Sequence, residues 1–296
     1  ARSETDSYGN ATVMIGLTPE GLENYREIIK GVLMYISLMQ KEGYKTGSYD
    51  ELKTMAELEE IYSNKGEGAS RAVGYANETL FYPLEDAGRV SYIYAHNGSL
   101  AYQRLLAQLT PDNMMVFLMS KGLETNKKEY FYQAPYAYEE DDVFYQELLD
   151  ISVHSDLLMK SENPFIPKSA TVPDRDLDDK AIPELIVDTK GEKIYFGQDN
   201  EFLRPKGVIT YKIFFSKENM NPAFRAKLKF YIACVNESLN ELAYPAKEAG
   251  LNYNIADGYE GVFITISGYQ ESSIVLLKTV INHLITPDIN EEQFSG

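Results

Sequence analysis

The sequence predicts an α+β protein with two lobes, each a set of mixed or antiparallel strands covered by long helices. A strand, a turn and an amphipathic helix follow one another twice, beginning at residues 13–17 and at residues 262–266. In the two helices, apolar residues recur at matching positions with the 3.6-residue period of an α-helix. With 44% hydrophobic residues over 296 positions, the chain has enough apolar surface for two cores. A chance recurrence of a common pattern is the alternative interpretation.

The first lobe is predicted to be mostly helical. A long helix is expected at residues 19–42, because Pro19 suits the first helical position and Gly43 a C-terminal stop. Ser48 is a suitable N-cap for a second helix at residues 49–63. The other elements expected here are a strand at residues 10–17, helices at 69–81, 85–94 and 99–109, and a buried strand at 113–120.

Residues 122–188 have a different composition, rich in tyrosine, proline and acidic residues. Prolines at positions 164, 167, 173 and 183 exclude long regular elements, and a helix fits only around residues 142–149. Because the aromatic residues of this stretch need burial, we expect an extended connection packed against the lobes rather than a flexible linker.

Regular structure resumes in a second lobe. Residues 252–256 and 261–267 form a predicted hairpin around the turn dipeptide Asp257-Gly258. The other elements expected are strands at residues 193–196 and 207–215 and helices at 222–249 and 270–285. The predicted division is therefore 1–121 for a mostly helical domain, 122–188 for the connection, and 189–296 for an α+β domain.

The net charge of −17 argues against a nucleic-acid partner and against an anionic membrane surface, since both need clustered Lys and Arg. No apolar run approaches the eighteen or more residues of a membrane span. The single cysteine, Cys234, excludes an intrachain disulfide framework.

Local chemistry predicts no catalytic or metal site. His96, His154 and His283 lie far apart, and neither zinc-peptidase motif, His-x-x-Glu-His or His-Glu-x-x-His, occurs. The run 174–178, Asp-x-Asp-x-Asp, imitates the start of a calcium loop. It has Asp179 where that loop needs glycine and Leu185 where it needs glutamate. We interpret it as a solvated acidic loop, with a weak surface cation as the alternative.

Several motifs in collinear order resemble the pitrilysin/insulysin family of zinc metallopeptidases. In that family an Asn-x-(Phe/Tyr)-Ile-Pro segment precedes a Pro-Glu-Leu-Ile-x-Asp element. Here residues 163–167 read Asn-Pro-Phe-Ile-Pro and residues 183–188 read Pro-Glu-Leu-Ile-Val-Asp. The similarity continues at residues 17–22, 42–43, 82–84, 109–113, 238–244, 246–254 and 268–269.

The resemblance implies the LuxS/MPP-like metallopeptidase fold, in incomplete copies. Members of the family have four homologous α+β domains that form two bowls around a peptide. Their zinc ligands and general base belong to the first domain and match no position here. The chain would be the latter part of the second domain, the connection, and the front part of the third. No cofactor is then expected in this chain, and zinc is expected in the longer parent, outside this segment.

The family also holds substrate at a sheet edge in its second domain, a sequence-tolerant way to bind peptides. The resemblance places this exosite at or just before residues 1–8, so its flank would include Arg2, Ser3, Thr5, Ser7 and Tyr8.

The function expected from the resemblance is that of a non-catalytic middle segment of a pitrilysin-like zinc endopeptidase, which forms chamber wall and assists peptide binding. A catalytically silent scaffold subunit of the same superfamily and an unrelated two-lobed binding module are the alternatives. The expected partners are the remaining domains of the parent and extended peptides. A homodimer through helical residues 22–39 and 274–284 is a further expectation. A bacterial parent would be periplasmic, with a cytoplasmic location as the alternative.

Overall fold

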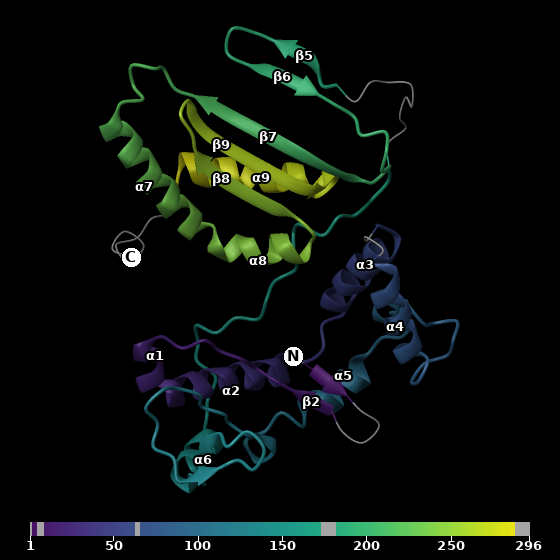
Figure 1. The fold of residues 1–296 in the computed structure, drawn as a ribbon, viewed down its shortest axis with the longest axis vertical. Coiled ribbons are helices and arrows are strands. Elements are labelled where there is room, and N and C mark those ends of the chain that lie inside the picture. The colour runs from purple at the N-terminus through teal and green to yellow at the C-terminus, as the bar shows by residue number, and fades with distance from the viewer. Residues whose placement is uncertain (1, 5–8, 63–65, 173–181, 288–296) are drawn as a thin grey trace. The chain divides into compact units, whose positions relative to one another are not determined.

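The structure is a computed structural model that describes residues 2–4, 9–62, 66–172 and 182–287. The chain divides into two compact units, each assembled from two stretches of sequence (Figure 1). Unit 1 contains residues 1–46 and 96–161, and unit 2 contains residues 47–95 and 162–296. Helices and small antiparallel sheets alternate along the chain, which confirms the α+β class. The predicted boundaries at residues 121 and 188 concern domains of a longer protein and stay a prediction.

Unit 1 is built around α2 (Tyr25–Glu42), against which α6 (Asp142–Leu149) packs. Phe144 and Leu148 of α6 join Leu33 of α2 in a small buried cluster. Arg26 stabilises the same contact at the edge of the cluster, because its guanidinium lies 2.5 Å from the Asp141 carboxylate and 5.1 Å from the centre of the Phe144 ring. The remaining elements are α1 (Pro19–Glu23), α5 (Ser99–Leu106), η2 (Pro111–Asn113) and the strand pairs β1 (Arg2–Glu4) with β2 (Gly9–Ala11) and β3 (Lys127–Lys128) with β4 (Pro135–Tyr136).

The first predicted helix is divided in two at Asn24. The Asn24 side chain donates to the carbonyl oxygen of Glu20 at 2.9 Å, and its backbone N–H donates to the same oxygen at 3.0 Å. An asparagine that bonds locally in this way favours a cap over a helix interior. The predicted start at Pro19 and stop at Gly43 are confirmed, with φ +73° at Gly43.

The buried strand predicted at residues 113–120 is wrong in this structure, and of the strand predicted at residues 10–17 only residues 10 and 11 form one, as part of β2. Residues 12–18 and 114–120 have no regular structure, and Met14 and Met119 are 82% and 88% exposed. A strand needs a neighbour to accept its backbone hydrogen bonds. No strand among the described residues pairs with either segment, so their strand-like sequences lie extended and uncovered.

Unit 2 contains a three-stranded antiparallel sheet in the order β7-β9-β8 (Figure 1). The strands are β7 (Lys206–Phe214), β8 (Asn252–Asp257) and β9 (Gly261–Tyr269), and β8 and β9 form the hairpin predicted around Asp257-Gly258. The other elements are α3 (Thr46–Tyr62), α4 (Gly68–Glu78), η1 (Val90–Tyr92), the hairpin β5 (Glu184–Asp188) with β6 (Lys193–Phe196), and the helices α7 (Pro222–Ser238), α8 (Asn240–Glu248) and α9 (Gln270–Ile285).

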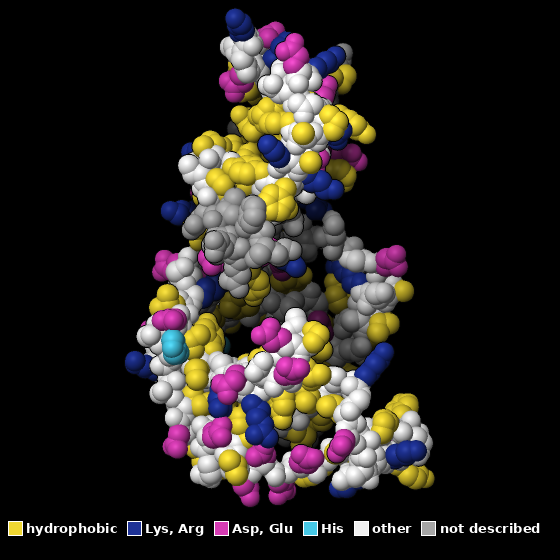
Figure 2. Space-filling view, turned by 90° about the vertical axis from the view of Figure 1, so that its left-hand side faces the viewer, with side chains coloured by type: hydrophobic (Ala, Val, Ile, Leu, Met, Phe, Trp, Pro, Cys, Tyr) yellow, Lys and Arg dark blue, Asp and Glu magenta, His cyan; other side chains and the backbone are white. Residues whose placement is uncertain are grey.

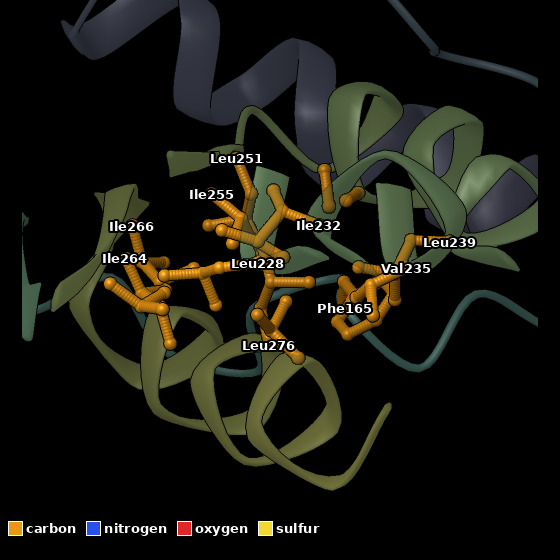
Figure 3. Close-up of a cluster of buried hydrophobic side chains, with 14 residues drawn as sticks. Phe165, Leu228, Ile232, Val235, Leu239, Leu251, Ile255, Ile264, Ile266 and Leu276 are labelled. Carbon is orange, nitrogen blue, oxygen red and sulfur yellow. The ribbon is translucent and has the colours of Figure 1, made fainter. Parts of the chain in front are cut away.

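The main core lies between this sheet and its helices. Ile264 and Ile266 of β9 are 0% exposed and point towards Leu276 of α9, while Val235 of α7 meets Phe165 (Figure 3). Burying a side chain of this size contributes about 1.5–3 kcal/mol. The alternation of buried and half-exposed residues along β9 is the period-2 pattern of a sheet with one covered face.

Three further expectations differ from the structure. The helix expected at residues 85–94 is present only as the single turn η1. The helix expected at residues 222–249 is divided at Leu239, where the Ser238 hydroxyl donates to the carbonyl oxygen of Val235 at 2.8 Å and tightens the turn. The tyrosines expected to be buried in the connection are exposed, Tyr130 by 81% and Tyr132 by 91%.

Candidate functional site

The predicted exosite flank falls on the first strand pair. Arg2 lies opposite Ala11 and Ser3 opposite Asn10, in the antiparallel pair of β1 and β2. Thr5, Ser7 and Tyr8 lie outside the described residues. The structure therefore places two of the five predicted residues in a short strand. Within the described ranges this strand pairs only with β2, which leaves its second edge without a strand partner.

The described part of the chain holds no cluster of three or more metal-ligating side chains. His154 is exposed beside Asp156, whereas the Nδ1 atom of His283 lies 2.9 Å from the carbonyl oxygen of Thr279 in its own helix. Cys234 is buried in α7. The acidic run at residues 174–179 lies outside the described residues. In the same described ranges, the helices are too short or too polar to cross a membrane.

The most extended candidate surface is the open face of the unit 2 sheet. Ile209 and Ile213 of β7 pack against the core, so the alternate residues Thr210 and Lys212 face the opposite way. Two rows of side chains cross this face: Thr210, Thr265 and Asn254 form one row, and Lys212, Phe263 and Ala256 form the next. The Lys212 ammonium group lies 5.1 Å from the centre of the Phe263 ring.

This face carries hydroxyl, amide and ammonium groups beside the apolar side chains of Phe263 and Ala256. None of its described residues is acidic, although the chain as a whole carries a net charge of −17. On the side of the molecule seen in Figure 2, acidic side chains lie among hydrophobic and basic ones. Groups of this kind form hydrogen bonds with a peptide backbone without selecting its side chains.

The outer edge of β7 adds a second way to hold an extended chain. β7 pairs with β9 along one edge, and no other strand in the described part of the molecule pairs with it. An edge strand of nine residues presents a row of free backbone groups that a further strand can join. Val208 and Phe214 are 69% and 66% exposed beside this edge.

Asn163 fixes the connecting segment to unit 2, a role that the sequence analysis missed. Its side-chain amide donates to the carbonyl oxygen of Pro245 at 2.8 Å, and its side-chain oxygen accepts from the N–H of Phe165 at 3.0 Å. Its own backbone N–H donates to the Glu51 carboxylate at 2.6 Å. Phe165, 2% exposed, is thereby held in the core cluster.

Glu271, in the first turn of α9, provides a second anchor. One of its carboxylate oxygens accepts from the backbone N–H groups of Lys168 and Ser169, at 3.1 and 3.0 Å. The signal in the sequence was the apolar pair Phe165-Ile166 between two prolines, inside an otherwise polar stretch. That pattern indicates a buried anchor, but it does not identify the helices that receive it.

Comparisons with known proteins give a consistent result. A family model described as the middle or third domain of M16 peptidases matches residues 61–296. The human insulin-degrading enzyme is 27% identical over 289 residues, which cover 95% of this chain and 28% of that protein. The insulin-degrading enzyme-like 2 of Arabidopsis thaliana is 27% identical, over 97% of this chain and 30% of its own length. The chain therefore spans less than a third of these relatives.

A solved structure shows the same fold. The crystal structure of pitrilysin superposes with a TM-score of 0.81 at 20% sequence identity, over 94% of this chain and 30% of the pitrilysin chain. At this identity the similarity is evidence for the fold alone. It agrees with the helices and antiparallel sheets described above.

Proposed function

The chain belongs to the M16 peptidase family as a middle segment of the insulysin and pitrilysin type, and from this membership we propose that it is a non-catalytic wall of a peptide-binding chamber. In this proposal the parent is a zinc endopeptidase whose metal is bound outside these residues. The segment contributes surface that holds extended peptides while another domain cleaves them.

The observation that carries the proposal is the open face and free edge of the β7-β9-β8 sheet. Its helices cover one side only, so the row of Thr210, Thr265 and Asn254 remains accessible in the described structure. Backbone pairing along β7 supports the binding of peptides with diverse sequences. Since this face carries the Lys212 ammonium group and no acidic residue among those described, we expect it to favour neutral or acidic peptides over basic ones.

Cleavage of a quenched fluorogenic peptide by this chain and by its full-length parent, with zinc added, tests the non-catalytic role. We expect chelator-sensitive cleavage by the parent and none by this chain. Chelator-sensitive cleavage by this chain alone would refute the proposal. A parent that lacks His-x-x-Glu-His upstream of residue 1 and does not cleave would support the catalytically silent scaffold instead.

Peptide binding is tested separately on the full-length parent. Thr210→Glu places a charge in the centre of the open face, and we expect it to raise KM about threefold or more with little change in kcat. The matched control is Thr54→Glu on α3, because Thr54 is half-buried and bonds only to its own helix, at the carbonyl oxygen of Asp50. Equal effects of the two substitutions on KM would exclude the sheet face as the binding surface.

The proposed homodimer involves α2 and α9. Ile274 and Val275 are 52% and 42% exposed on α9, and apolar residues on a helix surface favour association. Sedimentation equilibrium of this chain should show a dimer that Ile274→Glu weakens. A single monomeric species at all concentrations would contradict it.

A further inference from the structure

The hairpin of β3 and β4 carries three consecutive aromatic side chains at its tip. Tyr130, Phe131 and Tyr132 are 81%, 80% and 91% exposed. Tyr130 and Phe131 lie edge to face, with ring centroids 5.1 Å apart. Single exposed apolar residues are common on protein surfaces, whereas a contiguous group of them marks an interaction site.

The backbone of the tip is held in one conformation by a side chain. The two carboxylate oxygens of Glu129 each accept one backbone N–H, from Phe131 and from Tyr132, both at 2.6 Å. The Gln133 side chain donates to the carbonyl oxygen of Tyr130 at 2.8 Å, and the Glu129 N–H donates to the carbonyl oxygen of Ala134 at 2.9 Å. These bonds pre-organise the tip.

Gln133 provides a further sign that the conformation is specified. Its φ is +56°, in the left-handed region that residues other than glycine seldom adopt. The hydrogen bond of its side chain to Tyr130 offsets part of this strain. A tip whose backbone is held around a strained residue, and which carries three exposed rings, is suited to a surface of complementary shape.

The size of the tip indicates what kind of partner it fits. Three aromatic side chains bury at most about 450–750 Å². A stable complex between separate molecules buries about 800 Å² on each partner. The tip alone is therefore too small to hold an independent protein. It suits a contact within one polypeptide, because the covalent link between the two parts gives them a high effective concentration. The relatives are more than three times as long as this chain, so most of such a polypeptide lies outside it.

We propose that the tip formed by residues 129–134 inserts into an apolar recess on another part of the parent polypeptide and fixes that part to unit 1. This inference rests on the proposed function only in treating the chain as one segment of a longer peptidase. It assigns the three rings to a permanent contact within the parent polypeptide. The competing possibilities are that the rings bind peptide substrate or a second copy of the chain.

Hydroxyl-radical footprinting with mass spectrometry tests the contact without any substitution. The oxidation rates of residues 130–132 are compared between this chain and the full-length parent. We expect them to fall at least tenfold in the parent. Unchanged rates would overturn the inference.

Two further footprinting experiments use this chain alone and test whether a competing partner binds the tip. Protection that appears on addition of an extended substrate peptide would assign the tip to substrate and overturn the inference. Protection that grows with the concentration of the chain would assign it to self-association, with the same consequence. A Glu129→Ala variant of the parent should recover at least part of the lost oxidation rate, because its tip is no longer pre-organised.

The footprint is read independently of cleavage. A parent that protects the tip but cleaves no peptide would refute the proposed function and leave this inference standing. A parent that cleaves peptide with an unprotected tip would refute this inference alone.

Discussion

The side-chain amide of Asn163 donates to the backbone carbonyl oxygen of Pro245, 2.8 Å away, although 82 positions separate the two residues in sequence. The same carbonyl oxygen also accepts the helical bond from the N–H of Ala249 at 3.1 Å. The contact joins the connecting segment to the middle of α8. Phe165 consequently enters the core from outside the helices and the sheet.

Replacement of Asn163 should destabilise unit 2. Asn163→Ala removes both side-chain bonds and leaves the buried N–H of Phe165 without its acceptor, at a cost of about 2–4 kcal/mol in the free energy of unfolding. Urea denaturation followed by circular dichroism measures this loss. Asn113→Ala is the control, because the exposed side chain of Asn113 donates only to the nearby carbonyl oxygen of Gln108. Its effect should stay within about 0.5 kcal/mol; similar losses for the two variants would contradict the anchoring role.

Gly261 should not tolerate a side chain. Its φ is +150°, and a Cβ atom would lie 1.8 Å from the carbonyl oxygen of Ile213 on the neighbouring strand. We expect Gly261→Ala to cost more than about 2 kcal/mol, since either the backbone or the strand pairing has to shift. Gly191, in the turn between β5 and β6, has no atom within 4 Å of such a Cβ and is the matched control. If the melting temperatures of the two variants decrease equally, the β7–β9 pairing is not as described.

Truncation of Ile264 measures the packing between sheet and helices. The side chain is 0% exposed, so Ile264→Ala should lower the free energy of unfolding by about 2–5 kcal/mol. Val208→Ala, on the open face of the same sheet, should change it by less than about 0.5 kcal/mol. A large effect at Val208 in this chain would mean that the face is covered after all.

The hairpin tip should respond to pH through Glu129. The backbone N–H groups of Phe131 and Tyr132 hold the pKa of this carboxyl below its ordinary value of 4.5. A carboxyl with a depressed pKa stabilises the folded form above the unfolded value and loses that contribution as the pH falls through the folded pKa. Amide hydrogen exchange at Phe131 and Tyr132 should therefore be slowed relative to a Glu129→Gln variant at pH 6. The difference should shrink below pH 4.5, and a pH-independent difference would exclude the carboxylate as its cause.

Several elements of both units were predictable from local patterns. The bounds of α6, β6 and α9 agree with the predicted ranges, and the β8–β9 hairpin forms around Asp257-Gly258 as expected. In each case a cap, a turn dipeptide or a stop residue lies at the boundary, so the signal is contained within a few neighbouring positions. β5 was missed because its apolar residues follow directly on the proline-rich connection.

The candidate site was less predictable. The sequence motifs led to the family and to the exosite flank, of which Arg2 and Ser3 now lie in a strand. They did not show the open sheet face, because which side of a strand is covered depends on where the helices pack. Nor did they show the aromatic tip, since exposed and buried tyrosines look alike in sequence.

The sequence by itself determined the α+β class, the family and most of the helices, because capping, periodicity and turn chemistry act over short distances. Tertiary structure alone decided which stretches pack together, including the grouping of residues 47–95 with residues 162–296. It also left residues 12–18 and 114–120 extended without a strand partner among the described residues. The physical reason is the same in both cases: a strand or an anchor is stable only when a distant segment supplies its hydrogen bonds and covers its apolar side chains.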